Sequence, residues 1–255
     1  NKINQNFGKG LMPFSPKAVI GVPSAISKVE RRAVITAAKK RGAGAAYLLE
    51  EPMAAAIGAG LPVGDPVGSM IVNIGGGTCE IAIISLGGVV SGRSLAIAGD
   101  TMDEDIIGYV RSRWGMIIGE AAAEEIKLTL GSAYPAASEK DMVVRGRDLE
   151  KGLPRSIKIS QSAVREALAP ACSAIISAIR EVAGDAPPEL LSDIAERGIV
   201  ICGGGALLSG LPKLIASETK LPVILASDPM SCVVLGTMRM VADDDLFGKV
   251  KVAKA

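Results

Sequence analysis

The sequence predicts an α/β protein, and three observations lead to that class. Short apolar runs of strand length alternate with longer segments of helical periodicity along the chain. Runs of three glycines directly follow two of the apolar runs. The chain is 255 residues long and 49% hydrophobic, which is enough to bury a sizeable core. Strands that alternate with helices favour mainly buried sheets.

The first part of the chain carries clear element signals. The apolar run at 17–22 predicts a strand that ends before Pro23, and a second strand is expected at 46–49. Between them, Ser27 and Glu30 have the spacing of a capping box and predict a helix over about 28–41. Pro52 suits the first turn of a short helix that continues to about residue 57.

The rest of the chain continues the alternation. Thr101 and Glu104 suggest a second capping box, for a helix that continues to about Trp114. Gly87 and Gly88 indicate a hairpin between two strands. Polar residues at 132–160 with short alternating runs suggest small edge strands. The other expected elements are strands at 69–74, 80–86, 89–96, 198–202 and 222–226, and helices at about 120–130, 162–183, 188–195, 206–217 and 229–241.

Composition excludes several kinds of function. Histidine is absent, which removes Ser-His-Asp and Cys-His catalysis as well as histidine-bound zinc sites. A net charge of +1 and only 3% aromatic residues argue against nucleic acid as a partner. The four cysteines are far apart and predict reduced, buried thiols. No apolar run reaches the length of a transmembrane helix.

The two glycine runs are the strongest candidates for a binding site. Gly75, Gly76 and Gly77 follow one buried strand and precede another, so they form a hairpin loop that could bind phosphate oxygens. Gly203, Gly204 and Gly205 follow a strand and precede an expected helix, whose N-terminus favours a phosphate. Either run alone is more often a tight turn. Two in one chain suggest a split nucleotide site in a cleft between two halves.

Several polar residues near these loops have both a structural and a functional interpretation. Glu51 either begins a helix in solvent or activates water for attack on a phosphate, and Thr78 could bond the same water. Asp100 fits a helix N-cap. Glu124 and Lys127 share one helix face, as a surface pair or as a clamp for a ribose.

The N-terminal segment is rich in glycine and proline and contains Leu11, Met12 and Phe14. These apolar side chains either pack on their own domain or insert into a partner or a membrane surface. The chain does not begin with Met, so we expect it to be a piece of a longer protein.

The combined pattern resembles the MreB rod-shape-determining proteins, the bacterial actin family. The resemblance covers essentially the whole chain. It is carried by KAVIGVPSAISKVERRAV, LLEEPMAAAIGAGLPV, MIVNIGGGTCEIAIISLGGVV, IAGDTMDEDI, AEEIKLTLGSAYP and ERGIVICGGGALLSGLPKLI. The motifs EEPMAAAIG and IGGGT alone would indicate only the wider superfamily of actins, chaperone ATPases and sugar kinases.

The resemblance implies an actin-like, ribonuclease H-like fold of two lobes with ATP and Mg²⁺ in the cleft between them. On this basis the first lobe is incomplete in this chain, because the family's N-terminal segment with its first phosphate loop is expected to be missing. The implied division assigns 1–64 to the first lobe, 65–101 with 164–231 to the core of the second, 102–163 to an inserted subdomain, and 232–255 to a C-terminal helix returning to the first lobe.

The resemblance also implies roles for single residues. Glu51 corresponds to the glutamate that activates the attacking water, and Thr78 to the threonine of the second phosphate loop. The nucleotide would contact Gly75, Gly76, Gly77, Thr78, Glu124, Lys127, Gly203, Gly204 and Gly205. Leu11, Met12 and Phe14 would touch the inner face of the membrane.

One departure from the family concerns the metal. Asn73 stands where the family usually has an aspartate that supports Mg²⁺ or its waters. The loss of charge should weaken metal binding or slow hydrolysis.

The leading hypothesis is therefore a cytoplasmic ATP-binding protein, peripheral at the inner face of the membrane. It would form filaments with itself and organise cell-wall synthesis, with cell-wall synthesis and membrane-anchor proteins as partners and slow ATP hydrolysis. The alternatives are a nucleotide-binding paralogue without hydrolysis, a truncated remnant that does not polymerise, and a soluble kinase-type enzyme of the superfamily.

Overall fold

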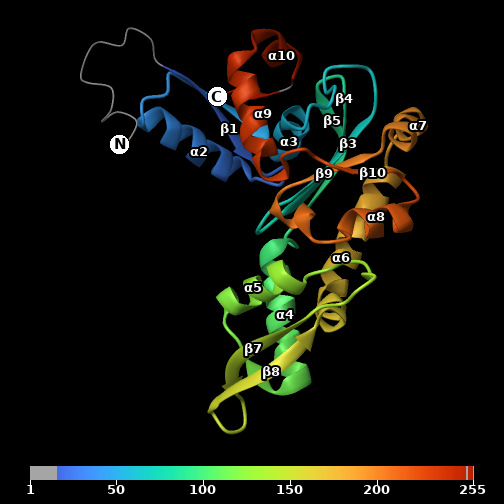
Figure 1. Ribbon diagram of the computed structural model, residues 1–255. Coiled ribbons are helices and arrows are strands. Elements are labelled where there is room, and N and C mark those ends of the chain that lie inside the picture. The colour runs from blue at the N-terminus through green and yellow to red at the C-terminus, as the bar shows by residue number, and fades with distance from the viewer. Residues whose placement is uncertain (1–15, 251, 255) are drawn as a thin grey trace.

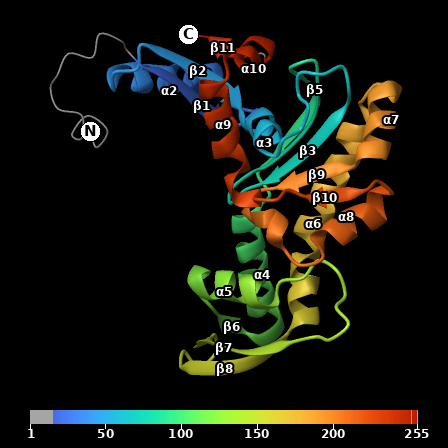
Figure 2. The same cartoon turned by 45° about the horizontal axis from the view of Figure 1, so that its top comes forward.

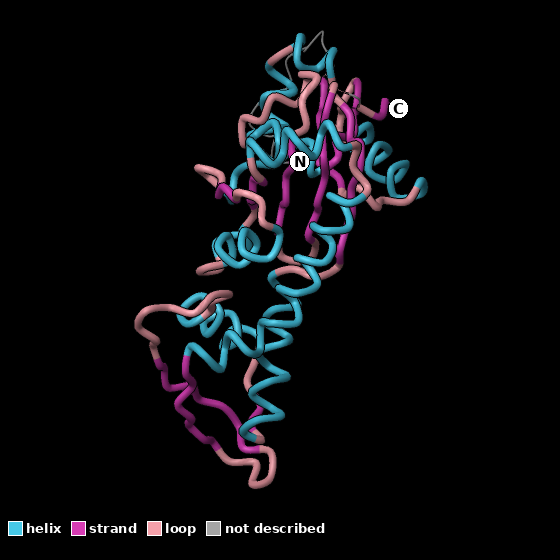
Figure 3. Tube along the Cα trace, turned by 90° about the vertical axis from the view of Figure 1, so that its right-hand side faces the viewer, coloured by secondary structure: helices cyan, strands magenta, loops and turns pink. Residues whose placement is uncertain are grey.

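The computed structural model describes residues 16–250 and 252–254. Two bodies are visible in Figure 1: an upper one that holds two sheets and a lower one built from two helices and a small sheet. The long helix α6 (Gln161–Gly184) runs between them, as Figure 3 also shows.

The strands form three sheets. Residues of the first sheet come from both ends of the described chain, and its order is β1-β2-β11, with β1 and β2 parallel. The central sheet has the order β10-β9-β3-β4-β5 and is mixed, because the β10–β9 and β9–β3 pairs are parallel while the β3–β4 and β4–β5 pairs are antiparallel. The third is antiparallel and has the order β6-β7-β8. Their bounds are β1 (Lys17–Val22), β2 (Ala45–Glu50), β3 (Ser69–Ile74), β4 (Cys79–Ser85), β5 (Gly88–Leu95), β6 (Met116–Ile117), β7 (Asp141–Asp148), β8 (Pro154–Ser160), β9 (Ile199–Cys202), β10 (Val223–Leu225) and β11 (Ala253–Lys254).

Helices cover both faces of the central sheet (Figure 2). The α-helices besides α6 are α2 (Lys28–Lys40), α3 (Glu51–Gly58), α4 (Gly99–Trp114), α5 (Glu120–Leu130), α7 (Pro188–Arg197), α8 (Leu211–Thr219), α9 (Cys232–Ala242) and α10 (Asp244–Lys249). Two short 3₁₀ turns, η1 (Gly204–Leu207) and η2 (Pro229–Ser231), precede α8 and α9.

Alternation along the central strands separates two hydrophobic cores. In β3, Met70, Val72 and Ile74 face a core shared with α4, α5 and α6, whereas Ile71 faces a second core shared with α3 and α9. Because side chains in a strand point alternately to opposite faces, Asn73 is on the same face as Ile71. The same face of β4 carries Ala82 and Ile84, and therefore Glu80.

Helix α6 is the main link between the two bodies. It is long and apolar enough, by length and composition, to cross a membrane, which was not expected from the sequence. Half of its most apolar stretch is nevertheless buried inside the protein. Leu168, Ile175 and Ile179 on α6 are fully buried in the larger core, so α6 acts here as a core helix.

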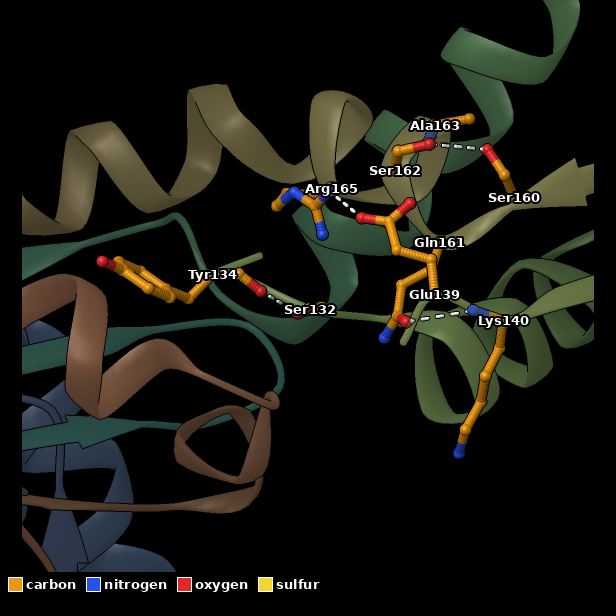
Figure 4. Close-up of polar contacts among 9 residues, drawn as sticks. All are labelled: Ser132, Tyr134, Glu139, Lys140, Ser160, Gln161, Ser162, Ala163 and Arg165. Atoms are coloured by element: carbon orange, nitrogen blue, oxygen red, sulfur yellow. Dashed lines mark hydrogen bonds and ion pairs between the residues drawn. The ribbon is translucent and has the colours of Figure 1, made fainter. Parts of the chain in front are cut away.

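Residues 131–140 connect α5 to β7, and Figure 4 shows polar contacts at both ends of this segment. Gln161 at the start of α6 donates its N–H to the carbonyl of Lys140 at 2.8 Å and accepts the Lys140 N–H at its side-chain oxygen at 3.3 Å. Arg165 pairs with Glu139 beside it. At the other end, the Ser132 hydroxyl donates to the Tyr134 carbonyl at 2.6 Å. Also at this end, the Ala133 N–H donates to the Ser209 carbonyl at 2.7 Å, so the segment is held to the start of α6 at one end and to the residues before α8 at the other.

Most predicted elements lie where the sequence placed them, and the Ser27–Glu30 capping box is confirmed by reciprocal bonds at 3.2 and 2.9 Å. The second capping box is wrong: no side chain caps α4, whose N-cap is Ala98. Asp100 is therefore not an N-cap, because it lies inside the first turn of α4.

The helix predicted over 206–217 is also wrong in its first half. A 3₁₀ turn ends at Leu207, and α8 begins only at Leu211. Gly210 separates the two with φ +74°, a left-handed conformation that an α-helix does not contain. The short helix α10 and strand β6 had not been predicted.

Candidate functional site

The two glycine runs meet at the carboxyl end of β3. A Cβ atom on Gly205 would lie 2.4 Å from the Ile74 side chain, and one on Gly203 would lie 2.2 Å from the Ile74 carbonyl oxygen. Gly203 also has φ +85°. Only glycine permits this close approach at Gly203, so the second run is required for packing as well as available for binding.

The first run forms the predicted tight hairpin loop and holds the start of α4. The Gly75 N–H donates to the Thr78 carbonyl at 2.9 Å, which closes the loop. The carbonyls of Gly75 and Gly76 accept the N–H groups of Gly99 and Asp100 at 3.1 and 2.8 Å. Within the described part of the chain, the N–H groups of Gly76 and Gly77 donate to no protein acceptor, so they are available to an anionic ligand.

A cavity of about 960 Å³ opens beside both runs. Of the residues that the sequence predicted to contact a nucleotide, six line it: Gly75, Gly76, Glu124, Lys127, Gly204 and Gly205. The start of α4 adds Gly99 and Asp100. The size lies in the range of natural ligand sites. Gly77 and Gly203 are not among the lining residues.

Lys127 is held rather than free. Its ammonium donates to the Asp103 carboxylate at 2.6 Å and to the Gly99 carbonyl at 2.8 Å, and both side chains are about 15% exposed. It thus joins α5 to the start of α4, next to the glycine loop. Lys127 pairs with Asp103 and not with Glu124, so the surface ion pair predicted between Glu124 and Lys127 is not formed in the structure.

The lining of the cavity is acidic. Described lining residues include one basic side chain, Lys127, and five acidic ones: Asp100, Asp103, Glu104, Glu120 and Glu124. A triphosphate entering this field would be repelled unless a cation came with it. Backbone amides and a divalent cation, rather than a cluster of arginines, are therefore the groups that could bind phosphates here.

The two predicted catalytic residues do not line the cavity. Thr78 ends the glycine loop and is half-buried. Glu51 begins α3, on the face of the central sheet opposite to α6. Burial raises the pKa of the Glu51 carboxyl above its ordinary range, and the nearby charge of Glu80 adds to the rise. A carboxylate with a raised pKa is a stronger base than an ordinary glutamate.

The residues present fit a divalent cation held partly through water. No group of three or more Cys, Asp or Glu side chains in residues 16–250 and 252–254 is arranged to hold a metal ion directly. Mg²⁺ does not need one, since it usually keeps several waters and takes one or two carboxylates plus phosphates. Asn73 and the fully buried Glu80 supply oxygen atoms on one face of the sheet, and one Glu80 oxygen has no partner.

Some predictions fall outside this site. Leu11, Met12 and Phe14 lie outside the described residues. Glu80 and Asp103 were not predicted from the sequence; the signal for Glu80 was a charged residue within the otherwise apolar strand CEIAIIS. For Asp103 no signal in the sequence separated it from its acidic neighbours on α4.

The central mixed sheet, the helical layers on its faces and the cavity beside two glycine loops define an actin-like protein. Solved structures agree. The MreB5 protein of Spiroplasma citri bound to ADP superposes with a TM-score of 0.86 at 39% identity, over 90% of this chain and 70% of that one. A double helical filament of MamK shares the fold, with a TM-score of 0.73 at 23% identity over 89% of this chain and 69% of its own.

The chain belongs to the MreB/Mbl family. The family model, described as MreB/Mbl protein, matches residues 2–248. The cell shape-determining protein MreB of Escherichia coli is 48% identical over 246 residues, covering 96% of this chain and 71% of that protein. The cell shape-determining protein Mbl of Bacillus subtilis is 43% identical over 253 residues, 99% of this chain and 75% of Mbl.

Proposed function

We propose that this protein is a cytoskeletal filament former that binds ATP with Mg²⁺, hydrolyses it slowly and sets cell shape at the inner face of the membrane. One observation carries the nucleotide part: two glycine loops and two helices converge on a single cavity of about 960 Å³. A second structure of the S. citri MreB5 protein, bound to AMPPNP, is 40% identical to this chain, which supports a nucleotide as the ligand.

Within this proposal each element has a task. The free amides of Gly76 and Gly77 bind phosphate oxygens, and Glu124 bonds the ribose from α5. Glu51 accepts a proton from the attacking water, and Thr78 orients that water. When bound, Mg²⁺ supplies positive charge that offsets the acidic lining and the phosphates.

The test for nucleotide binding is titration with a fluorescent ATP analogue in the presence of Mg²⁺. Glu124→Ala should raise the Kd at least tenfold, because it removes a hydrogen bond inside the cavity. Glu189→Ala on α7, away from the cavity, is the control and should leave the Kd unchanged. Equal affinity of the wild type and Glu124→Ala would place the nucleotide elsewhere.

The test for hydrolysis is phosphate release. Glu51→Ala should lower kcat at least tenfold while the Kd for ATP stays within threefold, since Glu51 lies outside the cavity lining. A parallel fall in affinity would indicate that Glu51 acts in binding.

Self-association and membrane contact are tested by sedimentation. With ATP the protein should pellet as filaments, and with anionic vesicles it should pellet with lipid. Replacement of Leu11 and Phe14 by Ser should abolish the lipid pellet and leave filaments intact. If this variant forms filaments and still binds lipid like the wild type, the N-terminal segment does not mediate membrane contact. Cell-wall synthesis and membrane-anchor proteins are the partners proposed for the filament.

A second candidate is a nucleotide-binding protein without turnover. Asn73 favours it, because the side chain at the end of β3 carries no charge and its oxygen accepts a weak bond from the Cys202 thiol at 3.5 Å. Phosphate release distinguishes the two: no turnover in the wild type, with turnover gained in Asn73→Asp, would establish the second candidate.

A further inference from the structure

A row of polar side chains crosses the central sheet in register. Cys202 on β9 pairs with Asn73 on β3, Asn73 with Glu80 on β4, and Glu80 with Ser94 on β5. The Cys202 thiol lies 3.5 Å from the Asn73 side-chain oxygen, and the Ser94 hydroxyl donates to one Glu80 oxygen at 2.6 Å. Four adjacent strands thus carry polar groups at the same level, at the end of β3 that leads into the glycine loop.

Glu80 is the unusual member of this row. Its side chain is fully buried, and its Oε2 atom has no hydrogen-bond partner. No Lys or Arg among residues 16–250 and 252–254 forms an ion pair with it. Leaving a buried carboxyl oxygen unpaired costs free energy of folding. A ligand of positive charge that reached Glu80 would offset this cost.

The surroundings of Glu80 supply further oxygen atoms. Helix α3 packs on the same face of the sheet and begins at Glu51, whose pKa responds to the charge of Glu80. Asn73 is opposite Glu80 on the adjacent strand. Two carboxyl groups and an amide oxygen form a donor set of oxygen atoms only, which suits a hard divalent cation and its waters.

Asn73 carries no negative charge to bind a cation, and its side-chain oxygen already accepts a hydrogen bond from the Cys202 thiol. Glu80 is the adjacent carboxyl on the same row. We propose that Glu80 provides the anionic contact, direct or through one water, for the divalent cation that arrives with the nucleotide. The negative charge that holds the cation would then come from β4, the strand next to the one that carries Asn73. This inference rests on the proposed nucleotide binding, because the acidic cavity beside the loop calls for a cation only when phosphates are present.

The experiment uses Mn²⁺ as the probe and electron paramagnetic resonance of free Mn²⁺ as the readout. In the presence of saturating ADP, Glu80→Gln should raise the Kd for Mn²⁺ at least tenfold. The same variant should have an unchanged or higher melting temperature without ligands, because the amide keeps an acceptor for Ser94 and removes an uncompensated buried carboxyl. A merely structural role for Glu80 predicts the reverse: a lower melting temperature and unchanged Mn²⁺ affinity.

Two further variants sharpen the result. Glu196→Gln, an exposed acid on α7, is the matched control and should not change the Kd for Mn²⁺. Asn73→Asp combined with Glu80→Gln moves the carboxylate across to β3 and should restore the affinity to within threefold of the wild type. If Glu80→Gln does not fold, Glu80→Asp keeps the charge on a shorter side chain and should raise the Kd at least threefold.

The outcomes separate this inference from the proposed function. A wild type that binds no ADP would overturn the proposed function itself. A wild type that binds ADP and Mn²⁺, with the same Mn²⁺ affinity in Glu80→Gln or, where that variant does not fold, in Glu80→Asp, would overturn the role of Glu80 alone.

Discussion

The ammonium of Lys127 lies 2.6 Å from the carboxylate of Asp103, with both side chains largely shielded from water. The same ammonium donates to the Gly99 carbonyl at 2.8 Å. The Lys127 side chain on α5 therefore neutralises the charge of Asp103 on α4 and also donates a hydrogen bond to the carbonyl of Gly99, the first residue of α4. It does so next to the loop that we propose binds phosphates.

This geometry predicts a stability cost for Lys127→Ala. The change leaves the Asp103 carboxylate without its partner in a site that is mostly buried, so the free energy of unfolding should fall by about 2–3 kcal/mol. Chemical denaturation measures it. The matched change Lys158→Ala breaks a far more exposed pair with Asp141 and should cost less than about 1 kcal/mol. Equal effects of the two changes would show that the Lys127 pair is no stronger than a surface pair.

Two neighbouring glycines of the second run should differ strongly in how far their replacement by alanine lowers the stability. Gly203→Ala places a Cβ 2.2 Å from the Ile74 carbonyl oxygen at a left-handed φ and should lower the free energy of unfolding by at least about 2 kcal/mol. A Cβ on Gly204 meets nothing within 4 Å, so Gly204→Ala should change stability by less than about 0.5 kcal/mol. Comparable melting temperatures for both variants would contradict the close packing described here.

The buried thiols predict a loss of stability at alkaline pH. Burial raises the pKa of Cys79 to about 12 and that of Cys172 to about 11. Because the folded pKa lies above the unfolded value, both thiols stabilise the fold fully below about pH 8.5. That contribution declines as the pH rises through about 11–12. Urea titrations from pH 7 to 11 should show the decline, and Cys79→Ala with Cys172→Ala should reduce its slope.

The N-terminal capping box of α2 can be tested separately. None of the residues of α2 is buried, so the helix depends strongly on local interactions. Ser27→Ala removes the acceptor for the Glu30 N–H and should lower the free energy of unfolding by about 1 kcal/mol. Hydrogen exchange should localise the loss to α2. Uniform loss across the protein would mean that α2 unfolds only together with the whole chain.

The sequence was sufficient to predict most of the fold because the periodicities are strong. The apolar strand at 69–74 and the glycine loop after it lie where they were predicted. The break before α8 was not predictable from periodicity, because residues 206–217 contain apolar positions compatible with one continuous helix. The conformation of Gly210, where a Cβ would clash with Tyr134 from a distant segment, decides against it.

The candidate site was predictable only in part, for a similar reason. Glycines after buried strands can be recognised locally, and six predicted residues line one cavity. The acidic character of that cavity depends on α4 and α5 packing side by side, which no local pattern specifies. The row from Cys202 to Ser94 depends on the register of four strands and becomes visible only when the sheet is assembled.

The two hydrogen bonds from Gly99 and Asp100 to the glycine loop couple the orientation of α4 to the conformation of that loop. A helix of the length of α4 extends for about 24 Å, so a tilt of about 10° at the loop would displace its far end by about 4 Å. The far end carries Trp114 and the small antiparallel sheet that follows it. A reorientation of α4 at the glycine loop would therefore move this small sheet by several ångströms.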